Sequence, residues 1–321
     1  MLPMQSDDAL LLRLMISDAA FLTTKEKSLL QNNLDSSARL ALMSIDDISI
    51  AVKRAFSRAT WNGKECLKKA QRAAKIIRAF GIEWTACDRF DFPAMLTEMT
   101  DPPYMLFYRG NLAALKNQCV SVVGTRRATV GARKAAEQFG HDAAADGTTV
   151  VSGLAFGIDI CAHKGALETG ATAAVLPCGI DTIAPPAHTK YAQRILQNGG
   201  LLISEYIPGT PAAAFRFVQR NRIVAALSPA TVVIQAPSGS GALITASLAL
   251  GYGRDVMLHE EAFSRDAELV EKANLQNLKA QIAMGKKVSS KIQYTVQRYR
   301  EDGAPVIANY AEYRSCLVQA S

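Results

Sequence analysis

The chain has 321 residues, enough for a full α/β core and small satellite domains. Hydrophobic residues make up 49% and charged residues 20%, and no apolar run approaches the roughly 20 residues that a membrane-spanning helix needs. The start of the chain places acids before its apolar stretch and lacks a basic region, which argues against a secretory signal. The composition therefore excludes a membrane protein and predicts a cytoplasmic one.

The net charge of +7 is compatible with a polyanionic partner. The segment 286–300 carries five basic residues, two tyrosines and no acid, and is either a solvated basic face or an auxiliary nucleic-acid contact. The six cysteines form no CxxC pair and the four histidines lack ligand spacing. We therefore expect buried, reduced thiols and no bound metal.

The first part of the chain predicts a small helical domain. Apolar residues recur at helical spacing in the runs 7–16, 25–34, 36–45 and 63–80. Gly81 follows the last run, as glycine commonly does after a helix. We predict an all-α domain of about four helices over residues 1–81.

From Ile82 onward the pattern changes to that of an α/β fold. A strand-like run at 82–86 is followed by Pro102–Pro103, which forbids helix there. Strand-like runs then alternate with helical ones; the strands are 118–124, 148–153, 171–177, 201–206, 230–237 and 254–259, and the helices are 129–147, 159–170, 187–200, 220–228 and 241–253. This predicts a doubly wound, mostly parallel sheet over residues 82–260.

The last segment, 261–321, is less informative. It predicts one helix over 266–285 and a turn at Asp302–Gly303, and is otherwise mixed.

Glycine-containing loops follow the predicted strands at their carboxyl ends, where such sheets bind ligands. The loop Gly124-Thr125-Arg126-Arg127 combines a residue suited to a tight turn with two fork-shaped phosphate donors. It lacks the other glycines of G-x-G-x-x-G, and the next strand ends in Ser152-Gly153 rather than in an acid. The pattern therefore argues against NAD, and we expect no cofactor.

A second anion site is predicted at the start of the helix that follows residue 240. Small residues expose backbone N–H groups there, and the helix dipole favours an anion, although an ordinary serine cap is the alternative. The predicted start of the preceding helix adds two arginines to the site. The residues in question are Ser238, Gly239, Ser240 and Gly241, with Arg220, Asn221 and Arg222.

Asp159, with His163 one helical turn later, invites an acid–base interpretation. We favour the structural alternative, in which Asp159 is a helix N-cap and His163 packs a helix. Glu205 is a single carboxylate without a partner, which is thin evidence for general acid–base catalysis. We therefore assign no catalytic residue.

The order of these motifs resembles the DNA-processing protein A family, DprA or Smf. Seven runs from Asp101 to His259 carry the resemblance, among them VVGTRRATVGARKAA, VVSGLAFGIDICAHKGAL and SGALITASLALGYGRDV. The resemblance implies an extended Rossmann domain with a helical N-terminal domain. It also implies a non-enzymatic protein of DNA uptake and recombination that binds single-stranded DNA, dimerises and loads the RecA recombinase.

The family's main phosphate-contacting arginine falls on Arg126. A lysine after the third strand contributes in the family, and Lys190 is the nearest lysine here. The loop around it departs from the usual YPxxN, with Ala184 in place of the tyrosine and His188 in place of the asparagine. After His259 the family's PG dipeptide is missing, and residues 261–321 show no clear winged helix.

The leading hypothesis is a single-stranded DNA-binding recombination mediator. Two alternatives use the same cleft: a nucleotide sensor, and an enzyme like the phosphoribohydrolases, whose PGGxGTxxE loop corresponds here to APSGSGALITASL without the glutamate. The predicted phosphate contacts are Gly124, Thr125, Arg126, Arg127, Ser152, Gly153, Lys190, Arg220, Asn221, Arg222, Ser238, Gly239, Ser240 and Gly241.

Overall fold

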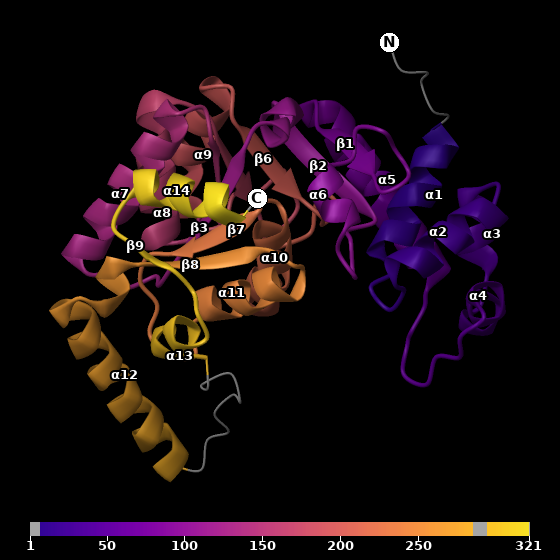
Figure 1. The fold of residues 1–321 in the computed structure, drawn as a ribbon. Coiled ribbons are helices and arrows are strands. Elements are labelled where there is room, and N and C mark those ends of the chain that lie inside the picture. Colours follow the sequence, from indigo (N-terminus) through magenta and orange to yellow (C-terminus); the bar gives the residue numbers. More distant parts are fainter. Residues whose placement is uncertain (1–6, 285–293, 321) are drawn as a thin grey trace. The chain divides into compact units, whose positions relative to one another are not determined.

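The structure, a computed structural model, describes residues 7–284 and 294–320 (Figure 1). Contacts between residues group the chain into two compact units. The first contains residues up to 109 with the short segments 177–182 and 203–213, and the second contains 110–176, 183–202 and the residues from 214 onward. Residues 82–109 thus group with the N-terminal helices, and the domain boundaries at 81 and 260 stay predictions.

The first unit begins with five helices, one more than predicted. They are α1 (Asp7–Asp18), α2 (Thr24–Asn33), α3 (Ser37–Leu42), α4 (Ile45–Val52) and α5 (Gly63–Phe80). The run at 36–45 divides because Ser44 caps a new helix, accepting the Asp47 N–H while the Asp47 side chain returns to the Ser44 N–H. Leu14, Met15 and Ile16 of α1 are fully buried and form the core of this helical region.

A short antiparallel pair completes the first unit. Gly81 ends α5 in the left-handed conformation, with φ of 58°, as its position predicts. Strand β1 (Glu83–Ala86) then pairs with β2 (Met105–Gly110) from Glu83 opposite Tyr108 to Ala86 opposite Met105. Helix α6 (Ala94–Thr97) lies between them in sequence.

The second unit is built on parallel strands in the order β5-β4-β3-β7-β8-β9. These are β3 (Cys119–Val123), β4 (Thr149–Ser152), β5 (Thr172–Val175), β7 (Ala230–Val233), β8 (Asp255–His259) and β9 (Val306–Ile307), and β6 (Leu201–Ser204) is divided between the units. Every residue of β3, β4, β5 and β7 is buried, as the continuous apolar runs predict. The doubly wound, mostly parallel fold class is confirmed.

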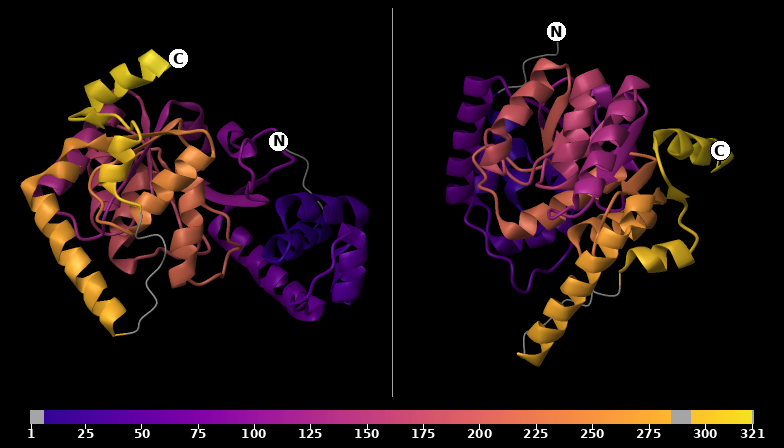
Figure 2. Two further views of the ribbon diagram at one scale, coloured as in Figure 1. Left: turned by 60° about the horizontal axis from the view of Figure 1, so that its bottom comes forward. Right: turned by 90° about the vertical axis from the view of Figure 1, so that its left-hand side faces the viewer.

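Helices cover both faces of this sheet, with α7 and α8 on one side and α10 and α11 on the other (Figure 1). The helices are α7 (Val130–Ala145), α8 (Ile158–Thr169), α9 (Thr189–Gln197), α10 (Ala214–Ala226), α11 (Gly241–Gly251), α12 (Arg265–Ala283), α13 (Val296–Glu301) and α14 (Tyr310–Ala320). Figure 2 shows α12 as a long helix projecting at one end of this unit. Helix α10 corrects the sequence analysis, because it begins at Ala214, well before the predicted start at Arg220.

Four predictions from the composition concern membrane-spanning helices, metal ligands, the cysteines and the basic segment. Within residues 7–284 and 294–320, no helix is long and apolar enough to cross a membrane, and no group of three His, Cys, Asp or Glu side chains is placed to hold a metal. The six cysteines are unpaired; four are buried, whereas Cys87 and Cys316 are half-buried. Residues 286–293 of the basic segment 286–300 lie outside the described residues. In its described part Arg298 and Arg300 are exposed, Arg300 lies over the Phe263 ring, and Tyr299 is buried, so both interpretations of the segment stay predictions.

Helices α7 and α8 approach so closely that two glycines are required between them. A Cβ on Gly165 would lie 1.7 Å from the Glu137 carbonyl oxygen, and one on Gly140 would lie 2.2 Å from the Ala162 carbonyl oxygen. Because both clashes are with backbone, side-chain repacking cannot relieve them. Figure 1 shows the two helices next to each other.

We therefore predict that Gly165→Ala destabilises the second unit by about 2 kcal/mol or more, because the helices must separate. Urea unfolding followed by circular dichroism measures this. The matched control is Gly251→Ala in α11, where a Cβ meets nothing within 4 Å. Equal stability of the two variants would contradict this account of the α7–α8 contact.

Candidate nucleic-acid interface

The sheet order places two of the predicted loops side by side. Strand β3 has β4 on one side and β7 on the other, so the strands on its two sides are added in opposite directions, and ligands of such sheets bind at this switch in strand order. The loop after β3 and the end of β7 are hydrogen-bonded, since the Thr125 N–H donates to the Gln235 carbonyl at 2.7 Å. The side chain of Gln235 also accepts the Thr129 N–H at 2.9 Å.

Two glycines allow the start of α8 to press against the same loop. A Cβ on Gly124 would lie 2.3 Å from Ile158 Cγ1. Gly157 has φ of +80°, and a Cβ there would lie 2.1 Å from the Thr125 carbonyl oxygen, which instead accepts the Ile158 N–H at 3.2 Å. The loop Gly124–Arg127 is therefore fixed by backbone contacts on both sides.

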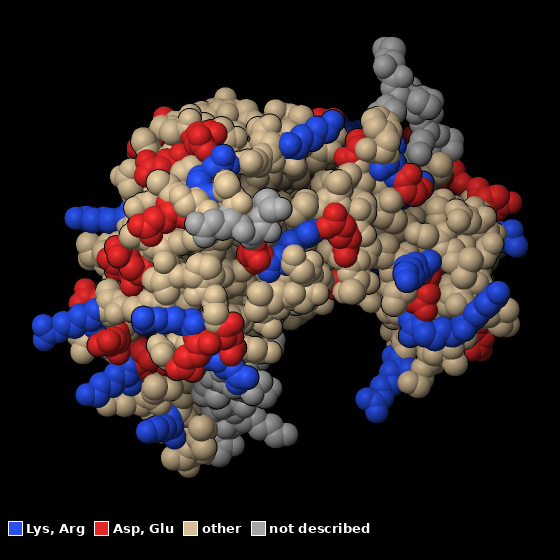
Figure 3. Space-filling model, viewed as in Figure 1, with Lys and Arg blue, Asp and Glu red and all other residues tan. Residues whose placement is uncertain are grey.

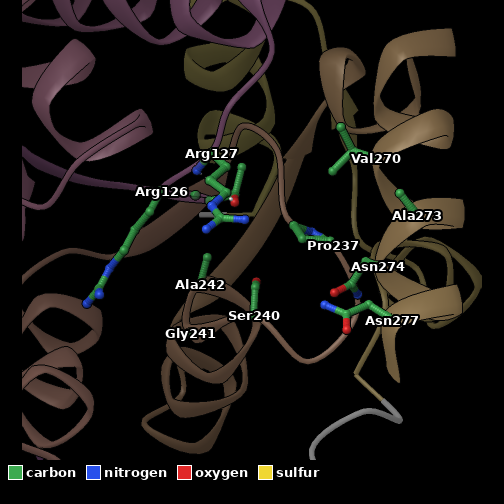
Figure 4. Close-up of a pocket in the computed structure, with 12 residues that line it drawn as sticks. Arg126, Arg127, Pro237, Ser240, Gly241, Ala242, Val270, Ala273, Asn274 and Asn277 are labelled. Atoms are coloured by element: carbon green, nitrogen blue, oxygen red, sulfur yellow. Dashed lines mark hydrogen bonds between the residues drawn. The ribbon is translucent and has the colours of Figure 1, made fainter. Parts of the chain in front are cut away.

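A cavity of about 570 Å³ opens beside this loop (Figure 4). Its other walls are Pro237, Ser240, Gly241, Ala242 and one face of α12, and the described residues that line it include two arginines and no acid. Arg126 and Arg127 are both exposed. The lining is Gly124, Thr125, Arg126, Arg127, Pro237, Ser240, Gly241, Ala242, Val270, Ala273, Asn274 and Asn277. Figure 3 shows acidic and basic side chains interspersed over one face, so the net charge alone does not locate the site.

Helix α11 presents its N-terminus to this cavity. Ser240 is its N-cap, the position that the ordinary serine-cap alternative gives it, but its side chain makes no capping hydrogen bond. Gly241 and Ala242, the first two residues of the helix, line the cavity. The dipole and free N–H groups of such a helix start favour an anion.

A smaller cavity of about 80 Å³ lies on the α10 side of the same loop. The Arg126 guanidinium lies 5.0 Å from the centre of the Phe217 ring, and Figure 4 shows the side chain pointing away from Asn274 and Asn277. On the same helix Arg216 lies over the ring of Phe215, which is 58% exposed. Sequence reasoning missed these aromatic residues because it did not assign 214–219 to a helix.

Arg220 is a correction to the predicted phosphate contacts. Its side chain is only 2% exposed, because the residue lies inside α10 rather than at its start. The guanidinium donates to the Gly153 carbonyl at 2.6 Å and to the Val175 carbonyl, at the ends of β4 and β5. We assign it to holding these strand ends, since a phosphate would have to displace both carbonyls.

The neighbours of Arg220 in the predicted site divide into two groups. Asn221 lines the smaller cavity and its amide donates to the Gly241 carbonyl at 3.3 Å. Arg222 is half-buried and lines neither cavity. The structure therefore brings Asn221, but not Arg222, to the rim.

Ser152 and Lys190 are also not brought to the cavities. Ser152 is fully buried and its hydroxyl donates to the Val122 carbonyl at 2.6 Å, so it is a packing residue and not a phosphate contact. Gly153 lies beneath the Arg220 guanidinium, where a Cβ would be 2.3 Å from a guanidinium nitrogen. Lys190 is exposed near the start of α9 but lines neither cavity.

The predicted loop 238–241 already holds an anion from the chain itself. The Glu271 carboxylate of α12 accepts the Ser238 N–H at 2.8 Å and the Ser238 hydroxyl. Gly239 is exposed with φ of +75° and lines neither cavity. Of this loop, Ser240 and Gly241 therefore remain as candidate phosphate contacts.

Asp159 and His163 have structural roles. Asp159 is not the N-cap, which is Gly157; its buried carboxylate accepts the N–H groups of Gly153 at 3.1 Å and Ala155 at 3.4 Å. Burial raises the pKa of Asp159, while the Arg220 charge opposes this rise. His163 is fully buried with Nδ1 2.7 Å from the Thr172 hydroxyl, and burial lowers its pKa to about 3. The packing interpretation of His163 is confirmed.

Comparison with known proteins identifies the family. The profile described as DNA recombination-mediator protein A matches residues 84–294. The chain is also 34% identical over 257 residues to protein Smf of Borreliella burgdorferi, covering 79% of this chain and 80% of that protein. The chain belongs to the DNA recombination-mediator protein A family.

Other family members agree over shorter stretches. Protein Smf of Escherichia coli is 41% identical over 51% of this chain and 44% of its own length, so the chain spans less than half of that relative. DprA of Streptococcus pneumoniae is 42% identical over 51% of this chain and 58% of its own length.

Two solved DprA structures share the fold of this family member. The X-ray structure of the Streptococcus pneumoniae protein has a TM-score of 0.67 at 26% identity and covers 94% of this chain and 95% of that one. A Helicobacter pylori DprA structure, described as showing a single-stranded DNA binding mode, has a TM-score of 0.57 at 26% identity and covers 74% of this chain and 97% of that one.

The burial of Arg220 gives a stability prediction. We expect Arg220→Met to destabilise the fold by about 3 kcal/mol, because it leaves buried carbonyls and the Asp159 carboxylate without their partner. Urea unfolding measures this. Arg194→Met, at an exposed arginine of α9, is the control and costs below about 1 kcal/mol. A loss at Arg220 no larger than that at Arg194 would contradict the structural role.

His163 gives a pH prediction. Its pKa is near 6.5 when unfolded and about 3 when folded, so folding favours the neutral ring. The resulting stabilisation is complete above pH 6.5 and falls by about 1.4 kcal/mol per pH unit as the pH drops toward 3. We expect the loss of stability between pH 7 and pH 4.5 to be about 2 kcal/mol smaller in His163→Gln. Equal pH dependence of the wild type and His163→Gln would refute the assignment.

Proposed function

We propose that the chain binds single-stranded DNA along the rim formed by the Gly124–Arg127 loop and the start of α11. The observation that carries the proposal is a pair of exposed arginines, Arg126 and Arg127, beside a helix N-terminus without a side-chain cap, in a lining that contains no acid. Guanidinium groups and helix N-termini are both favourable partners of phosphate. The single-stranded DNA binding mode described for the Helicobacter pylori relative supports the same ligand.

The aromatic residues of α10 favour a single strand over a duplex. Unpaired bases stack on exposed rings, and an adjacent arginine strengthens the contact. Phe215 is 58% exposed, and Phe217 lies against Arg126. A strand whose phosphates lie on Arg126 and Arg127 would therefore have rings within reach of its bases.

We also propose that the site is not enzymatic. A phosphoribohydrolase needs a carboxylate at the ribose, and among the residues that the structure describes, no acid lines the larger cavity. Asp159 lines the smaller one but is engaged with the Gly153 and Ala155 N–H groups. This supports a mediator that holds DNA rather than cleaves a nucleotide.

The remaining assignments come from the family resemblance. We propose that the protein acts in the cytoplasm in DNA uptake and recombination, forms a homodimer, and delivers single-stranded DNA to the RecA recombinase. Membership of the recombination-mediator family supports this role.

The direct test is fluorescence anisotropy with a labelled oligo-dT and the matching duplex. We expect tighter binding of the single strand, and a severalfold loss with Arg126→Ala, because a phosphate contact and its stacked ring contact are both lost. The slope of log K against log salt should fall by about 0.7 in this variant. Arg194→Ala, at an exposed arginine of α9, is the control. Unchanged affinity in Arg126→Ala would overturn the site assignment.

A further inference from the structure

Two side chains of helix α12 form hydrogen bonds with Ser238, in the loop just before α11. The carboxylate of Glu271 accepts both the N–H and the hydroxyl of Ser238, and Asn274 Nδ2 donates to the Ser238 carbonyl at 3.0 Å. Three polar groups of one loop residue thus meet one face of α12. This face, with Val270, Ala273, Asn274 and Asn277, forms a wall of the 570 Å³ cavity.

Hydrogen bonds fix how the two asparagine amides face the cavity. Asn274 Nδ2 donates to the Ser238 carbonyl, so the acceptor Oδ1 is the atom of this amide that lies on the side away from Ser238. Asn277 Oδ1 lies 3.3 Å from Gln281 Nε2, which donates to it, so its Nδ2 is directed elsewhere. Figure 4 shows both carboxamides on the cavity side of α12, with the Asn277 nitrogen directed toward Ser240. The wall therefore presents an acceptor and a donor one helical turn apart.

An acceptor and a donor on the same cavity wall complement the edge of a nucleobase. The pairing edge of each base places a hydrogen-bond donor beside an acceptor, and unpaired bases are recognised on these edges. Val270, Ala273 and Pro237 supply apolar surface for the ring, and Arg127 lies across the cavity from the amides (Figure 4). A volume of about 570 Å³ falls within the range of small-ligand sites.

We propose that this cavity binds one nucleobase, read at its edge by Asn274 and Asn277, with the attached phosphate at Arg127 and the start of α11. The phosphate half of this site rests on the proposed function. The ligand is thus a nucleoside phosphate unit, either one residue of a single strand or a free nucleotide. Because all four bases carry a donor beside an acceptor, the site strengthens binding without selecting one sequence.

The test compares oligo-dT with an oligomer of equal length that contains abasic residues, so that the phosphates stay the same. We expect the wild type to prefer oligo-dT. In Asn277→Ala this preference should shrink by about fivefold, the usual effect of one hydrogen bond. Asn277 is exposed on a helix and alanine favours helices, so the variant should fold. Gln276→Ala, at the adjacent exposed position, is the matched control and should keep the preference.

A second arm identifies the source of the base. If a free nucleotide is the ligand, dTMP should displace oligo-dT from the wild type and not from Asn277→Ala. If a strand residue is the ligand, dTMP should have no effect while the abasic difference remains. The proposal is overturned if the wild type binds both oligomers equally and calorimetry shows no binding of dTMP that depends on Asn277. It is also overturned if Asn277→Ala behaves like Gln276→Ala.

The outcomes separate this proposal from the function on which it rests. Arg126→Ala should weaken both oligomers alike, since each carries the same phosphates. If the wild type binds neither oligomer, single-stranded DNA binding fails, and calorimetry of dTMP with the wild type and Asn277→Ala still decides whether the base site exists.

Discussion

The rim depends on one constraint, the close backbone approach between the loop after β3 and the start of α8. Gly124 lies against Ile158 and Gly157 lies against the Thr125 carbonyl, at distances that no Cβ can share. The Thr125 N–H meanwhile donates to Gln235 at the end of β7. Because the backbone is fixed from both sides, Arg126 and Arg127 leave it in defined directions, one toward α10 and one into the larger cavity. Such a restriction lowers the entropy cost of ordering two flexible arginines at the proposed phosphate site.

Beneath the rim, the charges that support the fold are separated from those that face solvent. Arg220 is buried and joins the ends of β4 and β5 through the Gly153 and Val175 carbonyls. Asp159 lies nearby and binds the N–H groups of the loop between β4 and α8. A buried cation and anion of this kind largely neutralise each other, so in the proposed function the attraction for DNA is assigned to the exposed Arg126 and Arg127. Arg220 and Arg126, which the sequence analysis placed in the same site, thus differ: Arg220 is buried and holds the strand ends, whereas Arg126 is exposed.

Helices and strands were easier to predict from the sequence than the roles of individual side chains, because the former depend on local patterns and the latter on contacts between distant residues. Alternating apolar runs and glycine-ended helices depend on local periodicity, so strands β3 to β8 and the helices between them were predicted. The start of α10 was missed because Phe215, Phe217 and Val218 lack a helical polar face and are exposed or half-exposed there. Whether Arg220 binds phosphate or carbonyls depends on strands 45 and 67 residues away, which no local pattern encodes. The loop 124–127 was located correctly because the strand before it and the turn within it are both local.

The contact between Glu271 and Ser238 was invisible to sequence reasoning for the same reason, and it changes what the glycine-rich loop can bind. The loop has two sets of donors, those of Ser238 and those at the start of α11. An internal carboxylate occupies the first set, and no acid lines the cavity beside the second. The proposed phosphate site is therefore narrower than the motif 238–241 suggests. The same carboxylate holds α12 against the loop, and the face of α12 that carries Asn274 and Asn277 forms a wall of the cavity in which we propose that a base binds.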